Sequence, residues 1–219
     1  MIKVRNIETW GFEHAIRGMR NPLDSWDKSD SYKTHIENRQ TLNTADFQFV
    51  LGDNDLALMR KLFDSSKTGN YAHRKYLRQI FVSMDITAPL YWWKEFDTYK
   101  VGTVANSCST MHTIHKRDLT MEDFSTEHLD EWSRIVFTMV IGLMNAARRN
   151  YIETGDKNEW WQIIQLLPSS FNQRRTVTMN YENVVTIIKQ RSGHKLDEWR
   201  EMVEVLKELP YIRAIMEDE

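Results

Sequence analysis

Residues 80–111 read IFVSMDITAPLYWWKEFDTYKVGTVANSCSTM, and this stretch decides the fold that we expect. From Ile80 to Ile86 every second residue is apolar, the period of a strand that packs one face on a core. Pro89 then suits the first turn of a helix, because that position needs no N–H donor. The helix expected at Leu90–Asp97 carries aromatic residues on nearly all sides, which indicates burial almost all round.

Small hydroxyl and amide side chains follow that helix, from Thr98 to Thr110. They are too small to build a core but can surround a polar ligand, so the segment could be the wall of a pocket. An ordinary hydrogen-bonded loop explains it equally well, because turns favour the same residue types. We predict a polar loop here, with both interpretations open.

Composition limits the classes of function. The chain has 219 residues and a formal net charge of −2, which gives no sign of the clustered basic surface that nucleic-acid binding needs. Its single cysteine, Cys108, cannot form an intrachain disulfide. No apolar run approaches a membrane span, and the first residues lack the apolar centre of a signal peptide. We predict a cytoplasmic protein of one domain, residues 1–219, that binds neither nucleic acid nor membranes.

The N-terminal half mixes short strands and helices. Alternation predicts an opening strand at Ile2–Ile7, and a short helix is expected at Trp10–Met19. Residues Leu23–Thr44 are polar and without periodicity, which predicts a mobile or functional loop. A second short strand is expected at Phe47–Leu51, and a helix with an apolar stripe at Leu56–Phe63.

Basic residues gather just ahead of the central strand, in Tyr71–Gln79, where His73 and Arg74 lie. Such cations could hold a phosphate if their side chains converge. A solvated helix face is the commoner explanation of the same pattern, and spacing alone does not decide between the two.

The C-terminal half is mainly helical. The longest helix, Glu127–Tyr151, has an apolar face too broad for a lone surface helix, so it should lie under other elements or at a subunit contact, and packing within one chain is favoured. Further helices are predicted at Asn158–Leu167, Glu182–Gln190 and Leu196–Leu209, with a strand at Thr176–Asn180. Because strands and helices do not alternate regularly, the fold class is α+β.

Familiar chemical motifs are absent. The sequence has no glycine-rich phosphate loop of either common type. Cys108 and His112 have a spacing that metal ligands can use, but no second cluster completes a ligand set. Neither a nucleophilic cysteine nor a serine triad has an identifiable base.

Two segments together resemble a known family, the flavin-dependent thymidylate synthases, also called thymidylate synthase complementing proteins. The C-terminal residues that carry the resemblance keep a fixed order and spacing: Leu167-Pro168, Thr178-x-Asn180, Arg191, His194 and Trp199. The central stretch is similar too, with His73 before a strand, then Ala88-Pro89, an aromatic helix and a loop with serine and asparagine. The resemblance covers roughly residues 45–209.

The resemblance implies a fold of short antiparallel strands with long helices, and a homotetramer with FAD bound between subunits. It also implies conversion of dUMP to dTMP, with methylenetetrahydrofolate as the carbon donor and NADPH as the reductant of the flavin. No covalent nucleophile on the protein is then required, because the cofactor performs the difficult chemistry.

Carried over position by position, the resemblance assigns roles to single residues. His73, Asn180 and His194 fall on positions that contact the flavin, and Lys100 is the remaining cation of a flavin-binding triplet. Arg191 falls on an arginine that contacts the pyrimidine and is the candidate catalytic residue. The remaining candidates for substrate binding are Glu95, Asn106 and Ser109, of which Ser109 matches a loop serine near the nucleotide phosphate. Without the resemblance, Arg191 and His194 would be interpreted as basic residues that cap a helix C-terminus.

The sequence also departs from the family pattern at charged positions. Thr98-Tyr99-Lys100 replaces the family's Arg-His-Arg, and a lysine cannot reproduce the bidentate contacts of a guanidinium group. Glu95 stands where a glutamine is expected, and Glu182 stands where the family often has an arginine. An alternative therefore stays open: the fold is retained in a non-catalytic ligand-binding protein, or in a structural or interaction protein.

Overall fold

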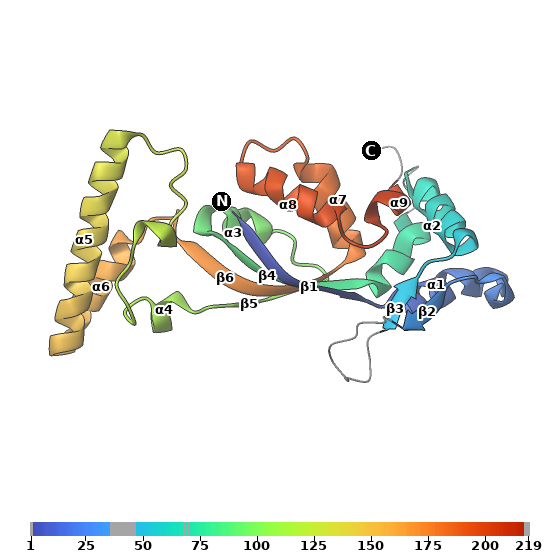
Figure 1. The fold of residues 1–219 in the computed structure, drawn as a ribbon, viewed down its shortest axis with the longest axis horizontal. Helices are drawn as coiled ribbons and strands as arrows, with labels where there is room; N and C mark the ends of the chain where they lie inside the picture. Colours follow the sequence, from blue (N-terminus) through green and yellow to red (C-terminus); the bar gives the residue numbers. More distant parts are fainter. Residues whose placement is uncertain (1, 36–46, 68, 70, 217–219) are drawn as a thin grey trace.

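The computed structural model describes residues 2–35, 47–67, 69 and 71–216. A four-stranded sheet occupies the middle of an elongated molecule (Figure 1). Its order is β1 (Lys3–Trp10), β4 (Phe81–Pro89), β6 (Asn172–Asn180) and β5 (Thr103–Ser107), and all neighbours are antiparallel. The α+β class predicted from the sequence is confirmed.

Strand β4 is central because its alternation buries one face completely. Val82, Met84 and Ile86 are at most 1% exposed, whereas the intervening residues Ser83 and Asp85 lie on the other, polar face. Three helices cover the apolar face: α3 (Leu90–Phe96), α7 (Tyr181–Arg191) and α8 (Asp197–Lys207) (Figure 1). The strand and the helix predicted in residues 80–97 are both confirmed.

The aromatic residues of α3 form the centre of the main core. The rings of Trp92 and Trp199, the latter on α8, have centroids 4.7 Å apart, and Trp92 also stacks on Phe96 at 5.1 Å. All three side chains are at most 1% exposed. Burial of such large rings stabilises by several kcal/mol in total, at roughly 25 cal/mol per Å².

Two segments predicted as loops contain strands. Thr103–Ser107, within the predicted loop Thr98–Thr110, is the edge strand β5, and a single helical turn, α4 (Thr110–Thr113), follows it. The side chains of β5 are mostly exposed, so no alternation of apolar residues marks this strand in the sequence. In the predicted loop Leu23–Thr44, Tyr32–His35 is strand β2, which pairs with β3 (Phe47–Val50). The rest of that prediction after residue 35 lies outside the described residues.

The small β2–β3 sheet packs at one end of the molecule, on the right in Figure 1, with the helices α1 (Phe12–Arg20), α2 (Asp53–Ser66) and α9 (Ile212–Met216). The basic segment Tyr71–Gln79 lies between this end and the main sheet as a kinked 3₁₀ helix, η3.

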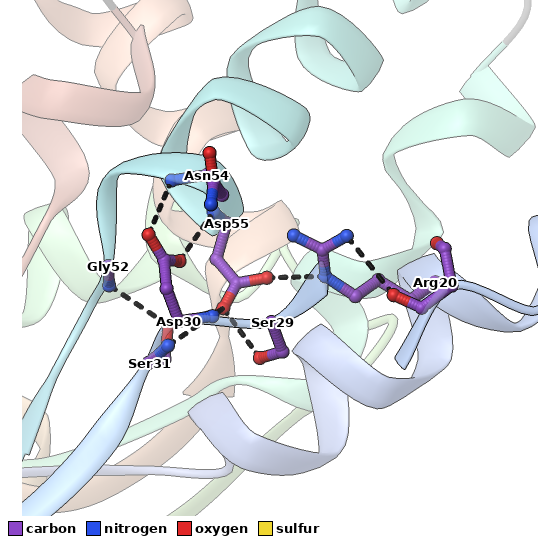
Figure 2. Close-up of polar contacts among 8 residues, drawn as sticks. Arg20, Ser29, Asp30, Ser31, Gly52, Asn54 and Asp55 are labelled. Carbon is purple, nitrogen blue, oxygen red and sulfur yellow. Dashed lines mark hydrogen bonds and ion pairs between the residues drawn. The ribbon is translucent and has the colours of Figure 1, made fainter. Parts of the chain in front are cut away.

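Asp55, at the start of α2, is fully buried and collects polar contacts from distant segments (Figure 2). Its carboxylate accepts hydrogen bonds from Arg20 Nε at 2.6 Å, Ser29 Oγ at 2.7 Å and Ser31 Oγ at 2.6 Å. Asp30 in turn accepts from the backbone N–H of Asn54 and Asp55, which satisfies donors at the N-terminus of α2. Residues 29–31, within the segment predicted as a loop, are therefore held by hydrogen bonds to the start of α2.

A second core lies at the opposite end, where α5 (Glu131–Thr154) packs on α6 (Lys157–Leu166) (Figure 1). Helix α5 begins at Glu131 because Asp130 caps it by accepting from the Ser133 N–H at 2.7 Å. One face of α5, with Ile141 and Met144, is buried in this core. Within the described residues, no helix combines the length and the apolar character that crossing a bilayer requires.

Packing within one chain does not account for the apolar face of α5. Trp132, Val136, Met139 and Leu143 recur at helical spacing and are 60 to 77% exposed. They lie apart from the buried face of α5. The expectation that the apolar residues of this helix are buried within one chain is therefore wrong for these four. We call them the α5 stripe.

We predict that Asp55→Asn lowers the free energy of unfolding by about 3 kcal/mol at neutral pH, because it leaves the buried Arg20 without its counter-charge. Asp53→Asn is the matched control. Asp53 is exposed two residues earlier on the same helix, so the cost there should stay within about 0.5 kcal/mol. Urea denaturation of the three proteins gives both values.

The effect of Asp55→Asn should depend on pH. Burial alone raises the pKa of Asp55, but hydrogen bonds from Ser31 and Ser29 and the bond and charge of Arg20 together hold this pKa below its ordinary value. A lowered native pKa stabilises the fold above the unfolded pKa of about 3.9, and this stabilisation is lost as the pH falls through the native value. The difference between wild type and Asp55→Asn should therefore shrink only below about pH 4; a constant difference from pH 7 to pH 3 would contradict it.

Candidate functional site

The carboxylate of Glu95, near the end of α3, is in contact with three other side chains: the predicted site residues Arg191 and His194, and Trp199. Glu95 Oε2 accepts hydrogen bonds from Arg191 Nη1 at 3.0 Å and Trp199 Nε1 at 2.9 Å, and His194 Nε2 lies 3.3 Å away. These donors come from α7, α8 and the turn between them. The structure thus joins residues that are about a hundred positions apart in the sequence.

The tautomer of His194 follows from its other contact. Its Nδ1 accepts a hydrogen bond from the backbone N–H of Leu196 at 3.2 Å. In the neutral ring the proton is then on Nε2, the nitrogen that faces Glu95. The neutral ring of His194 is therefore oriented with its Nε2–H donor toward the carboxylate.

Arg191 is held on three sides. Its guanidinium carbon lies 4.7 Å from the ring centre of Trp199 and 5.6 Å from that of Tyr99, and its Nε donates to the Tyr99 hydroxyl at 2.9 Å. The side chain is 19% exposed. These contacts replace the helix-capping interpretation of Arg191, because its hydrogen bonds go to side chains of other elements.

A second cation is neutralised in the same way. Arg74 of η3 donates to Glu182 Oε1 of α7 from Nε at 2.9 Å and from Nη2 at 2.7 Å, and both side chains are at least 85% buried. Glu182 Oε2 is buried and has no hydrogen-bond partner among the described residues. The basic segment is thus tied to α7, which fits neither a free phosphate-binding cluster nor a fully solvated face at Arg74.

Asn180 sits at the other end of α7 and caps it, because its Oδ1 accepts from the Asn183 N–H at 3.1 Å. Gly102 packs against it with a φ of 73°, and a Cβ on Gly102 would come within 2.5 Å of Asn180 Nδ2. Asn183 donates to the Val101 carbonyl at 2.8 Å, which fixes the turn after Lys100 on the start of α7.

The structure brings together only some of the predicted site residues. Glu95, Arg191 and His194 form one cluster. Asn180, the N-cap of α7, is eleven residues before Arg191, a distance of about 16 Å along the helix. Lys100 is exposed in the turn near Asn180, and His73 lines a separate cavity of about 640 Å³.

The two remaining candidates lie on β5 and in the short segment that follows it. Asn106 is exposed on that edge strand, and Ser109 precedes α4, where its carbonyl accepts from Thr113 Oγ1 at 2.8 Å. Sequence reasoning missed the role of Tyr99, which it counted only as a departure from the family pattern. A tyrosine beside a lone lysine gave no signal that its hydroxyl would bind Arg191.

Comparison with known proteins defines the class of fold. No family model matches the sequence, and no curated protein matches it. The architecture, however, is that of the flavin-dependent thymidylate synthases, so the expected arrangement of short antiparallel strands and long helices is confirmed.

Two solved structures show this likeness in detail. Thymidylate Synthase X (ThyX) from Helicobacter pylori with FAD and dUMP superposes with a TM-score of 0.67 and 16% sequence identity, over 100% of this chain and 98% of that one. A second structure of the flavin-dependent thymidylate synthase ThyX from Helicobacter pylori, complexed with FAD and dUMP, gives 0.65 and 16%, over 98% and 99%. At this identity the likeness establishes the fold.

The Arg74–Glu182 pair gives a test of the described geometry. Either Arg74→Gln or Glu182→Gln should cost about 3 kcal/mol of stability, because the partner is left buried and uncompensated. The double variant should cost clearly less than the sum. Strict additivity in urea denaturation would show that the two side chains do not interact.

Proposed function

We propose that this protein binds FAD and a pyrimidine nucleotide and acts as a divergent flavin-dependent thymidylate synthase, on dUMP or a related pyrimidine nucleotide. The observation that carries the proposal is the convergence of Arg191, Glu95 and His194 at one half-buried point. In the resemblance these are substrate and flavin positions, and the fold is shared with proteins solved with FAD and dUMP.

The cluster has the polar groups that a pyrimidine edge requires. The carboxylate of Glu95 is an acceptor for a ring or amino N–H, and Arg191 is a donor for an adjacent carbonyl oxygen or ring nitrogen. Arg191 Nη2 makes no hydrogen bond within the described residues, so it can donate without breaking the contact of Nη1 with Glu95. The rings of Trp199 and Tyr99 keep the guanidinium in place.

The residues around the start of α7 suit a flavin at a position shared between chains. Gly102 leaves room for the amide of Asn180, and Lys100 adds a positive charge in the same turn. His194 and His73 are the other predicted flavin-binding residues. Within one chain they lie away from Asn180, so they would contact the same flavin only from another copy. A bound FAD would transfer hydride, with methylenetetrahydrofolate as carbon donor and NADPH as reductant, while these residues hold and orient it.

The alternative is a ligand-binding or structural protein of the same fold without this reaction. It is supported by the acidic partners of both Arg74 and Arg191, since a nucleotide phosphate needs cations that are not already neutralised. The alternative also explains the replacement of Arg-His-Arg by Thr98-Tyr99-Lys100. A flavin spectrum separates it from the main proposal.

Assembly of several copies is part of the proposal. The α5 stripe exposes Trp132, Val136, Met139 and Leu143 on one side of a long helix, and apolar surfaces of this kind mark contacts between subunits. A homotetramer would cover the stripe and supply the site with residues from more than one copy.

We predict that the protein purified from cells absorbs in the visible flavin bands, or gains thermal stability when FAD is added. With FAD, NADPH and methylenetetrahydrofolate, it should release tritium from dUMP labelled at C5. Arg191→Ala should abolish this release, whereas Arg213→Ala, a change on the exposed surface of α9, should leave it within about twofold. Bound flavin without tritium release would exclude dUMP as the substrate and leave a related pyrimidine nucleotide. No flavin binding at all would support the non-catalytic alternative.

We further predict that Val136→Glu dissociates the assembly, because it places a charge in the α5 stripe. Thr138→Glu adds the same charge on the exposed polar side of the same helix and should leave the mass unchanged. Light scattering after size exclusion measures both. A native protein that is monomeric at high concentration would overturn the assembly proposal.

A further inference from the structure

A cavity of about 730 Å³ opens at the end of the molecule that carries the small β2–β3 sheet, on the right in Figure 1. It is lined by the junction of β1 and α1, by both strands of the small sheet, and by the turn ahead of α9. None of the described lining residues belongs to the Glu95–Arg191 cluster. Most of them, including residues 9–14 and Lys33, also lie outside residues 45–209, so the resemblance assigns this cavity no role.

Aromatic rings line the wall of the cavity. Phe12 stacks on Phe49 with ring centroids 5.3 Å apart, and the ring of Tyr211 stands edge-on to both. Trp10 stacks on Phe81 with centroids 5.8 Å apart, yet Trp10 remains 45% exposed. One face of the Trp10 indole is therefore open to a ring that enters the cavity.

Tyr211 is held in place by contacts within the protein. Its hydroxyl accepts from the Leu51 N–H at 3.1 Å and donates to the Phe49 carbonyl at 2.9 Å. Its φ of 63° is a left-handed conformation, which is strained for a bulky residue and persists only where surrounding contacts enforce it. The Pro210 carbonyl supplies one such contact by accepting from the Tyr181 hydroxyl at 3.0 Å. A wall that is already rigid lowers the entropic cost of binding.

The charges of the described lining residues cancel. Glu13 and Lys33 form an ion pair at 2.8 Å, and both side chains are half-exposed. His14 Nδ1 lies 2.7 Å from Arg17 Nη2. Because a guanidinium group only donates, Nδ1 is the acceptor, and the His14 ring is neutral with its proton on Nε2. The cavity thus offers apolar rings without net charge, which disfavours both anions and cations.

We propose that this cavity binds an uncharged, planar heteroaromatic molecule, held mainly by stacking on Trp10 and by apolar contact with Phe49. A charged ligand would lose part of its hydration on entering, and the described lining has no unpaired charge to compensate for that loss. Thr9 and Gln48 line the same cavity and suit the few hydrogen-bonding atoms of a heterocycle. The volume falls in the range of about 300 to 1,000 Å³ that small-molecule sites occupy.

Three indole compounds that differ in charge are the probes. Indole-3-acetamide is neutral, indole-3-acetate is an anion and tryptamine is a cation. Calorimetric titration into the full-length native protein at neutral pH should give saturable binding of indole-3-acetamide, and each charged compound should bind at least about fivefold more weakly. Cyclohexylacetamide, which is neutral but lacks a planar ring, should also bind at least about fivefold more weakly.

The indole N–H signal of Trp10 in the NMR spectrum of ¹⁵N-labelled protein locates the binding site. The chain has eight tryptophans, and the signal that disappears in Trp10→Phe belongs to Trp10. Indole-3-acetamide should shift this signal saturably. The signal of Trp26, which is exposed outside the lining, should stay unchanged.

Two tryptophan variants test the stacking contact. Trp10→Ala should raise the dissociation constant of indole-3-acetamide at least about fivefold, the effect of losing one aromatic face. Trp26→Ala removes a ring of the same kind that is 55% exposed and outside the lining, so it should change this constant less than about twofold. Melting temperatures of both variants confirm that they are folded.

The ion pair of Glu13 and Lys33 gives an independent test of the neutral lining. Lys33→Gln leaves Glu13 unpaired and should strengthen the binding of tryptamine relative to indole-3-acetamide at least about threefold. Glu13→Gln leaves Lys33 unpaired and should favour indole-3-acetate by a similar factor. Because an exposed pair contributes little to stability, both variants should remain folded.

No saturable binding of indole-3-acetamide up to about 10 mM would overturn the proposal. Equal effects of Trp10→Ala and Trp26→Ala would also overturn it, because they would show only general adsorption to apolar surfaces. Equal affinity of the three indole compounds would contradict the selection of an uncharged ring. The result is independent of the proposed synthase: Arg191→Ala should bind indole-3-acetamide as the wild type does, whether or not flavin is bound.

Discussion

The carboxylate of Glu95 is the contact on which the arrangement of the candidate site depends. It lies near the end of α3, the helix that follows the central strand, and it accepts from Trp199 and Arg191, with His194 also in reach. Hydrogen bonds to a charged group stabilise by roughly 1.5 to 3 kcal/mol when buried, and by less where solvent screens them. Several such bonds on one half-buried acid fix the turn between α7 and α8 against the aromatic core.

The same contact restricts what the site can bind. A ligand that needs Arg191 has to share it with Glu95, because the carboxylate already satisfies one face of the guanidinium group. The free donors of Nη2 remain on the side that Tyr99 and Trp199 leave open. A nucleobase edge meets this condition with both an N–H and an oxygen, whereas a phosphate would be repelled by Glu95. The cluster is thus better suited to the base of a nucleotide than to its phosphate.

Strand β4 and helix α3 could be predicted from the sequence because buried faces require apolar residues at regular spacing. Strand β4 alternates over its whole length, and α3 is aromatic on nearly all sides. Strands β2 and β5 leave no such trace, since their side chains are largely exposed. No local pattern marks Asp55 as a buried residue, because the donors to its carboxylate are 24 to 35 residues away in the sequence. Such contacts exist only after the chain has folded.

The candidate site, too, could be predicted only in part from the sequence. Arg191 and His194 could be selected from their order and spacing, and Glu95 was selected because it replaces an expected glutamine. Their meeting depends on tertiary packing that no local pattern encodes. The pairing of Arg74 with Glu182 became visible only in the structure, and it gives a physical reason for an acidic residue at that position of α7.

The most direct test of this account is calorimetric titration of dUMP into the native protein, with and without FAD, for wild type and Arg191→Ala. The account predicts one saturable site per chain in the wild type and an affinity at least about tenfold weaker in the variant, which lacks a charged donor to the base. Equal affinity in the two proteins, or no binding by a correctly folded wild-type protein, would contradict it.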